Sequence, residues 1–123
     1  ASDVYKRQVL DCSPGPRRDL VADASVLYDG VWEVTAHSNR VGVRLDRPAG
    51  GSGLLEHRDD AGELRSEGIA HGSVQIPPNG RPVVFLADHP VTGGYPVIAV
   101  LDAPSLDAAA ALVAGMSFRF RDL

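Results

Sequence analysis

A polar segment between two strongly apolar runs is the first place where this sequence could do chemistry. It extends from Asp88 to Pro96, and its adjacent glycines, Gly93 and Gly94, permit backbone angles and close approaches that other residues do not. Because Asp88 directly follows an apolar run, its carboxylate could act as a general base or orient a partner group. The alternative is that Asp88 and Thr92 only cap a tight hairpin through local bonds to the backbone.

A second polar segment contains Arg40, preceded by Ser38 and Asn39. The guanidinium of Arg40 can give two donors to a planar carboxylate or to a carbonyl group. The alternative interpretation is a surface turn with a solvated arginine. The residues alone favour this alternative slightly.

The third candidate group is Ser66 and Glu67, followed by Gln75. Gln75 lies among the apolar residues Val74 and Ile76, so its side-chain amide is expected to be partly buried and to need hydrogen-bond partners. Either a ligand or the protein backbone could supply them.

Several kinds of site are not indicated by the sequence. The four histidines lack metal-ligand spacing and there is one cysteine, so a zinc site is not expected. Neither a phosphate-binding glycine loop nor a GxSxG nucleophile motif is present. The only lysine is Lys6, which leaves no biotin-accepting or Schiff-base lysine in the predicted domain.

Composition agrees with one ordinary globular domain. The chain has 123 residues, of which 44% are hydrophobic and 23% charged. The net charge of −4 gives no electrostatic reason to expect a nucleic acid or an anionic membrane as partner. No apolar run approaches the roughly 20 residues of a membrane span. The single Cys12 fits a reducing cytoplasm.

The elements that must position these residues are mostly short strands. Many glycines and prolines with few aromatics favour a mainly β fold, a compact barrel or sandwich with two short helices at its ends. The apolar run at 83–87 is predicted to pair with the run at 97–101. Residues 48–63 are predicted to form an exposed loop, and residues 1–8 to be a leader or boundary outside the domain. Further strands are predicted at 9–12, 31–36, 41–45, 72–76 and 118–120, and helices at 19–28 and 105–113.

Three residues indicate where the second predicted helix begins and ends. Ser105 is placed to cap its first turn, where Asp107 would also favour the helix dipole. Gly115 is expected to end it.

Several short motifs, in order along the chain, resemble one known family. The chain is similar to the C-terminal half of the biotin-dependent carboxyltransferase-like proteins, also called allophanate hydrolase subunit 2, a family that includes KipA and the C subunit of 5-oxoprolinase. The resemblance covers residues 9–123. The matching motifs are Gly15-Pro16-Arg17, Ser38-Asn39-Arg40 with Gly42 and Arg44-Leu45, Ser66-Glu67-Gly68, Gly72 to Pro77, and Asp88 with Thr92 to Pro96.

The resemblance implies a cyclophilin-like β-barrel lobe and work on small amides or lactams. A cleft between lobes would place Arg40, Gln75 and Asp88 near the substrate, and our hypothesis is that Arg40 and Asp88 are catalytic and that Gln75 bonds to the amide edge of the substrate. The resemblance also implies a partner that resembles allophanate hydrolase subunit 1 or the B subunit of 5-oxoprolinase, and ATP or carboxybiotin handled by the parent complex rather than by this chain. The remaining substrate-binding residues expected from the motifs are Ser38, Asn39, Ser66, Glu67, Thr92, Gly93, Gly94 and Tyr95.

Two functions follow as expectations. The first is a part of a subunit of an ATP-dependent 5-oxoprolinase or a related allophanate or urea amidolyase complex, inactive in isolation. The second is a non-enzymatic, KipA-like regulator that binds a histidine-kinase inhibitor. Pro90 and Val91 replace a polar pair of the family motif, so specificity can differ here.

Overall fold

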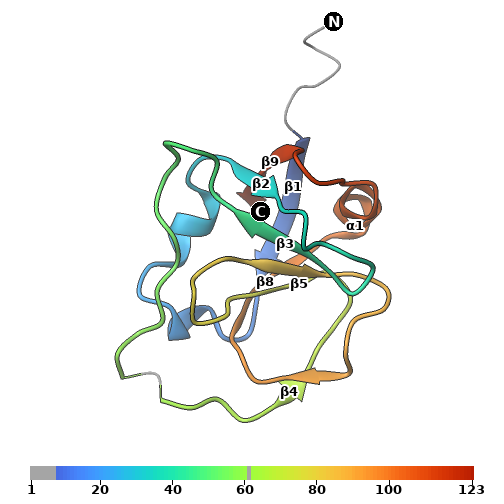
Figure 1. Ribbon diagram of the computed structural model, residues 1–123. Helices are drawn as coiled ribbons and strands as arrows, with labels where there is room; N and C mark the ends of the chain where they lie inside the picture. The colour runs from blue at the N-terminus through green and yellow to red at the C-terminus, as the bar shows by residue number, and fades with distance from the viewer. Residues whose placement is uncertain (1–7, 61) are drawn as a thin grey trace, which may run out of the picture.

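The chain folds into a closed barrel of seven strands. The computed structural model describes residues 8–60 and 62–123. All neighbouring strands are antiparallel except β1 and β9, which pair in parallel and close the barrel. The strands, in their order around the barrel, are β1 (Gln8–Pro14), β8 (Val97–Leu101), β5 (Ser73–Gln75), β6 (Val83–Phe85), β3 (Gly42–Asp46), β2 (Trp32–Val34) and β9 (Ser117–Asp122) (Figure 1).

This architecture confirms the mainly β prediction and selects the barrel over the sandwich. The leader predicted at 1–8 lies outside the described residues except for Gln8, which begins β1. Among the described residues, no helix is long and apolar enough to span a bilayer.

The predicted pairing of residues 83–87 with 97–101 is wrong. β5 lies between β6 and β8, so that Val74 pairs with Val84 on one side and with Ala99 on the other. Residues 83–85 and most of 97–101 are buried as predicted, because each strand is covered on its two faces, whereas Ala87 at the end of the first run is exposed. The connection at 88–96 therefore passes over the outside of the barrel instead of forming a tight hairpin.

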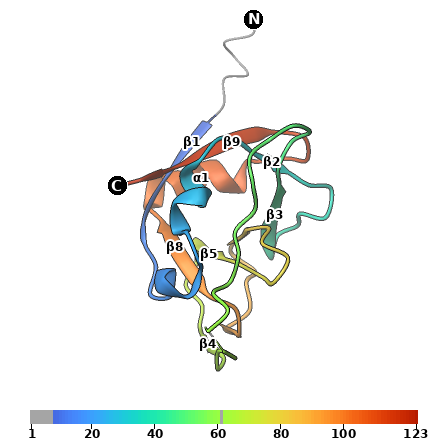
Figure 2. The same ribbon diagram turned by 90° about the vertical axis from the view of Figure 1, so that its left-hand side faces the viewer.

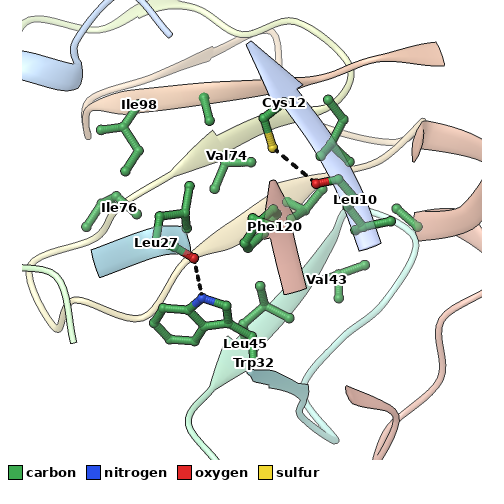
Figure 3. Packing of buried hydrophobic residues seen from close by; sticks show 14 of the residues in the cluster. Leu10, Cys12, Leu27, Trp32, Val43, Leu45, Val74, Ile76, Ile98 and Phe120 are labelled. Atoms are coloured by element: carbon green, nitrogen blue, oxygen red, sulfur yellow. Dashed lines mark hydrogen bonds between the residues drawn. The ribbon is translucent and has the colours of Figure 1, made fainter. Parts of the chain in front are cut away.

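An apolar core fills the barrel (Figure 3). Trp32 is its largest fully buried side chain, and its Nε1 donates a hydrogen bond to Leu27 O over 2.9 Å. The guanidinium of Arg47 lies 3.6 Å from the centroid of the Trp32 ring and donates to three backbone carbonyls, so a cation–π contact and three hydrogen bonds seal this side of the core.

One α-helix, α1 (Ala103–Ala110), packs against β1 (Figure 1). Its N-cap is Asp102 and not Ser105, because the Asp102 carboxylate accepts from the backbone N–H of Ser105 over 3.0 Å. The buried Ser105 hydroxyl instead accepts from Asp11 N over 2.8 Å. The helix also ends earlier than predicted, and Gly115, with φ +92°, lies in the turn before β9.

The helix predicted at 19–28 is also wrong. The segment forms two 3-10 turns, η2 (Arg18–Leu20) and η3 (Ala24–Tyr28). Between them, Val21 makes a β-bridge with His57, which takes its backbone out of helical geometry. The partner segment is not simply an exposed loop, since Leu55 is buried in the core.

A small two-stranded ribbon lies outside the barrel. It pairs β4 (Glu67–Gly68) with β7 (Thr92–Gly93), and β4 lies at the end of the molecule away from the start of β1 in both views (Figures 1 and 2). A buried cluster of Ile69, Val83 and Phe85 lies apart from the main core, on the ribbon side of the sheet.

Candidate functional site

The ribbon and the outer face of the barrel enclose a cavity of about 110 Å³, here called the ribbon cavity. Three of the predicted site residues, Glu67, Gly93 and Tyr95, contribute to its wall. The complete lining is Pro16, Arg17, Leu64, Glu67, Gly68, Ile69, Ala70, Ser73, Gly93, Tyr95, Val97 and Val100.

The floor of the ribbon cavity depends on an irregularity in β8. Val74 pairs with Ala99, but Gln75 pairs with Val97, so that one extra residue, Ile98, is accommodated in β8. Ile98 and Ala99 both belong to the core. Val97 and Val100 both line the cavity.

Arg17 and Glu67 form an ion pair in the cavity wall. Arg17 Nε lies 2.7 Å from Glu67 Oε1, and the two side chains are 44% and 33% exposed. The backbone N–H of Arg17 donates to Val97 O over 3.0 Å, which holds Arg17 beside β8. Pairing of Glu67 with Gly93 holds the carboxylate on the ribbon.

Two polar side chains are buried under the ribbon. Ser73 is 2% exposed and Gln75 is 6% exposed. Within residues 8–60 and 62–123, neither side chain makes a hydrogen bond, yet neither has a fully buried polar atom without a partner; in that part of the chain the only such atom is Tyr28 Oη. Gln75 is thus more deeply buried than the sequence predicted.

Packing requires a glycine at position 93 but not at position 94. A Cβ at Gly93 would lie 2.6 Å from Ile69 Cδ1 and 2.8 Å from Gln75 Nε2, so only glycine lets the ribbon approach the barrel here. A Cβ at Gly94 would meet only Leu64 O, at 3.7 Å. Neither glycine has a positive φ, so the expectation that they supply special backbone angles is wrong.

A larger cavity of about 310 Å³ adjoins the ribbon cavity and shares Leu64 and Tyr95 with it. Gly94 and His57 contribute to its wall. His57 Nε2 lies 2.7 Å from Ile76 O, and because a carbonyl oxygen can only accept, Nε2 carries the ring proton. In the neutral form of the ring, the other nitrogen, Nδ1, is then an acceptor.

Arg40 and Asp88 contact each other elsewhere, on the open surface. Arg40 Nε and Nη2 each lie 3.0 Å from Asp88 Oδ2, and the side chains are 90% and 49% exposed. Asp88 does not cap a local hairpin. An ion pair this exposed contributes about 0–1 kcal/mol.

Ser38 and Asn39 build the turn that presents Arg40. The Ser38 hydroxyl accepts from Arg44 N over 2.9 Å, and Asn39 Oδ1 accepts from Val41 N over 2.9 Å. With Arg40 they line a different cavity, of about 330 Å³, between this turn and the end of α1.

The predicted site residues therefore fall into two groups. Asp88 and Gly93 are five positions apart in the sequence, so their Cα atoms lie at most about 18 Å apart. Ser66 and Thr92 are exposed beside the ribbon cavity. They line neither the ribbon cavity nor the larger cavity that adjoins it. Val91, at 82% exposure, points its side chain to solvent, while its carbonyl accepts from Ile69 N.

Arg17 and Ser73 are cavity residues that were not predicted. Arg17 follows a Gly-Pro pair, and Gly15 packs so closely on β8 that a Cβ would lie 2.6 Å from Val97 O, a constraint that the sequence signals only as a turn. Ser73 is two residues from Gln75, and strand alternation places the two on one face.

The described residues contain no lysine, and Arg17 and Arg40 are each paired with a carboxylate. In the same part of the chain, no three side chains of the metal-ligating types gather closely enough to hold a metal ion.

Comparison with known proteins identifies relatives along nearly the whole chain. The family model for the carboxyltransferase domain, subdomain A and B, matches residues 1–122. The C subunit of 5-oxoprolinase from Escherichia coli (strain K12) is 38% identical over 90 residues, covering 72% of this chain and 27% of that protein. The C subunit of 5-oxoprolinase from Haemophilus influenzae is 34% identical over 134 aligned residues, covering 98% of this chain and 41% of that protein. The chain thus spans less than half the length of either relative.

Solved structures share the fold. The crystal structure of TTHA0988 is 33% identical, with a TM-score of 0.76 over 94% of this chain and 21% of that chain. The K. lactis urea amidolyase is 24% identical, with a TM-score of 0.83 over 97% of this chain and 8% of that chain, a likeness of fold alone. Together with the family model and the two bacterial relatives, these matches show that the chain belongs to the biotin-dependent carboxyltransferase-like family.

Proposed function

We propose that this chain is part of the C subunit of a 5-oxoprolinase, in a complex that uses ATP to convert 5-oxoproline to glutamate. The observation that carries the proposal is the identity of 38% and 34% to two proteins of that name. Because the chain spans 27% and 41% of their lengths, the complete activity requires further segments. A related allophanate- or urea-processing complex is the nearest variant of this proposal.

The proposed partner is of the same type as the B subunit of 5-oxoprolinase, in the cytoplasm. ATP or carboxybiotin would be bound by other parts of the complex. In this proposal Arg40 polarises a carbonyl or holds a carboxylate of the substrate, and Asp88 orients or deprotonates it. The contact between them supports a shared role, and the amide of Gln75, which makes no hydrogen bond within the described residues, supports a bond to the amide edge of the substrate.

The test is 5-oxoproline-dependent ATP hydrolysis by the full-length protein assembled with its partner subunits. Arg40→Ala and Asp88→Ala should each lower turnover at least tenfold. Arg81→Ala is the matched control, because Arg81 also forms a half-exposed ion pair, with Asp46, outside the ribbon cavity and the Arg40 cavity.

Two outcomes would contradict these proposals. Turnover like that of the wild type in both variants would overturn the roles of Arg40 and Asp88. Absence of turnover of any lactam or urea, together with a stable complex with a histidine-kinase inhibitor, would instead favour the KipA-like regulator.

A further inference from the structure

The Arg17–Glu67 pair places a hydrogen-bond donor and an acceptor side by side in the wall of the ribbon cavity. One contact joins them, Arg17 Nε to Glu67 Oε1 at 2.7 Å. Among the described residues, the two Nη atoms of Arg17 and Oε2 of Glu67 have no other hydrogen bond. A ligand can therefore bind to both side chains without breaking the bond between them.

A side-by-side donor and acceptor match one kind of small-molecule edge. In a lactam, a primary amide or urea, an N–H and the C=O point to the same side of the C–N bond. In the trans amide of a peptide they point to opposite sides. One cis amide edge can accept from Arg17 and donate to Glu67 at the same time.

We infer that Arg17 and Glu67 bind the cis amide edge of a small lactam, primary amide or urea in the ribbon cavity. The choice of an amide rests on the proposed function, but these two residues are distinct from Arg40 and Asp88. The inference keeps the expected substrate-binding role of Glu67 and adds Arg17, which the sequence motifs did not identify as a substrate-binding residue.

The remaining walls of the ribbon cavity suit such a ligand. Ser73 lines the cavity, and its hydroxyl, which makes no hydrogen bond within the described residues, can bond to a second polar atom of the ligand. Val97 and Val100 offer apolar contact to a ring. At about 110 Å³ the cavity is smaller than the sites that hold drug-sized ligands, so it suits a molecule of few atoms.

The charges in the wall also favour a neutral edge over an anion. Arg17 attracts a carboxylate, but Glu67 lies against Arg17 and repels the same group. A neutral amide satisfies both side chains without adding charge.

Ligand pairs that differ by one group test the recognition directly. The ¹⁵N-labelled chain is titrated with 2-pyrrolidone, and the amide signals of Gly68 and Gly93 in the cavity wall are followed. N-methyl-2-pyrrolidone has the same ring without the N–H, and N-methylacetamide is a trans amide. Saturable shifts with 2-pyrrolidone are expected, with roughly tenfold or more weaker binding of the other two, since each loses a hydrogen bond to a charged group.

Variants of Arg17 and Glu67 test whether these two side chains bind the ligand. Arg17→Ala and Glu67→Ala should each weaken 2-pyrrolidone binding roughly tenfold or more. Glu67→Gln keeps an acceptor and should retain part of the affinity, which a merely structural role for the carboxylate would not predict. Arg81→Ala, checked for the same dispersed spectrum, should bind like the wild type.

The inference is overturned if 2-pyrrolidone does not bind, if N-methylation does not weaken binding, or if the Arg17 and Glu67 variants bind like the wild type. Failure of the proposed function has a different signature. It is an assembled complex without 5-oxoproline turnover, and it can occur while the chain still binds 2-pyrrolidone through Arg17 and Glu67.

Discussion

The two faces of β5 are both buried, yet they differ completely in chemistry. The inner face places Val74 in the core with Ile76, which directly follows the strand, among side chains that pack without polar atoms. The outer face places Ser73 and Gln75 under the ribbon, where neither makes a hydrogen bond within residues 8–60 and 62–123. The inner face is therefore built for stability, and the outer face keeps polar groups that a ligand can use.

The largest expected effect is on the reactivity of the Cys12 thiol, which lies inside the barrel. Its burial, assisted by the carboxylates of Asp11, Asp122 and Asp102, raises the pKa of the thiol from 9.0 to about 12. At pH 8 its thiolate should be about a thousandfold rarer than that of an ordinary cysteine. Reaction with a thiol reagent should be negligible in the native protein and fast in denaturant, whereas fast native labelling would show that the interior opens to water.

The same pKa shift has a consequence for stability. The pKa is raised on folding, so the contribution of Cys12 is complete below pH 9.0 and is lost as the pH rises toward about 12. Denaturation midpoints measured across this interval should fall.

Ile76→Ala tests the inner surface of the barrel. Ile76 is fully buried in the core, and its truncation leaves a cavity, so the free energy of unfolding should fall by about 2–5 kcal/mol. Urea denaturation measures the change. A loss well below 1 kcal/mol would mean that the interior repacks easily, contrary to the comparison.

Gly93→Ala tests the contact between the ribbon and the outer face. The added methyl group would collide with Ile69 and Gln75, and such overpacking costs about 1–3 kcal/mol. Gly94→Ala is the matched control, because its Cβ has ordinary van der Waals space, and its effect should stay within about 0.5 kcal/mol. Equal effects of the two substitutions would show that the ribbon does not pack closely on the barrel.

Gln75→Leu should have the opposite sign to Ile76→Ala, although the two residues are adjacent. Replacing this largely buried amide, which makes no hydrogen bond within residues 8–60 and 62–123, by an apolar side chain should raise the free energy of unfolding by up to about 1 kcal/mol. Turnover of 5-oxoproline by the assembled complex should fall. Destabilisation by Gln75→Leu would instead show that the amide is needed by the fold.

The smallest expected effects on the free energy of unfolding come from the two arginine–carboxylate pairs. Double-mutant cycles in urea denaturation should measure a coupling of about 0.5–1 kcal/mol for Arg17–Glu67 and about 0–0.5 kcal/mol for the more exposed Arg40–Asp88. Added salt should lower both. A stronger coupling in the Arg40–Asp88 pair would reverse the ranking of the two sites.

The barrel could be predicted because local patterns report burial. Continuous apolar runs identified β6 and β8, and alternating residues identified β5 and β9. The same patterns do not say which strands are neighbours, and this is why β6 and β8 were paired wrongly across β5. The amphipathic spacing of apolar residues in 19–28 predicts a helix that includes Val21. The bridge from Val21 to His57, which prevents that helix, is a contact between residues distant in sequence.

The candidate site was predictable in part for a similar reason. Glu67, Gly93 and Tyr95 belong to motifs whose glycines and polar residues are visible locally, and the structure gathers them. Arg17 reaches them because the chain after β1 runs beside β8, which no local pattern indicates. The sequence also could not separate the Arg40 group from the ribbon group, since the path of residues 88–96 outside the barrel depends on the strand order.

The extra residue in the bulge of β8, Ile98, determines which side chains of this strand face the ribbon. In a regular strand, Val97 and Val100, three positions apart, would face opposite sides. The extra residue Ile98 brings both to the cavity while Ala99 and Leu101 stay in the core. A one-residue deletion at this point would exchange the cavity floor with core side chains, so the length of β8, more than the identity of its valines, determines whether this chain forms the cavity.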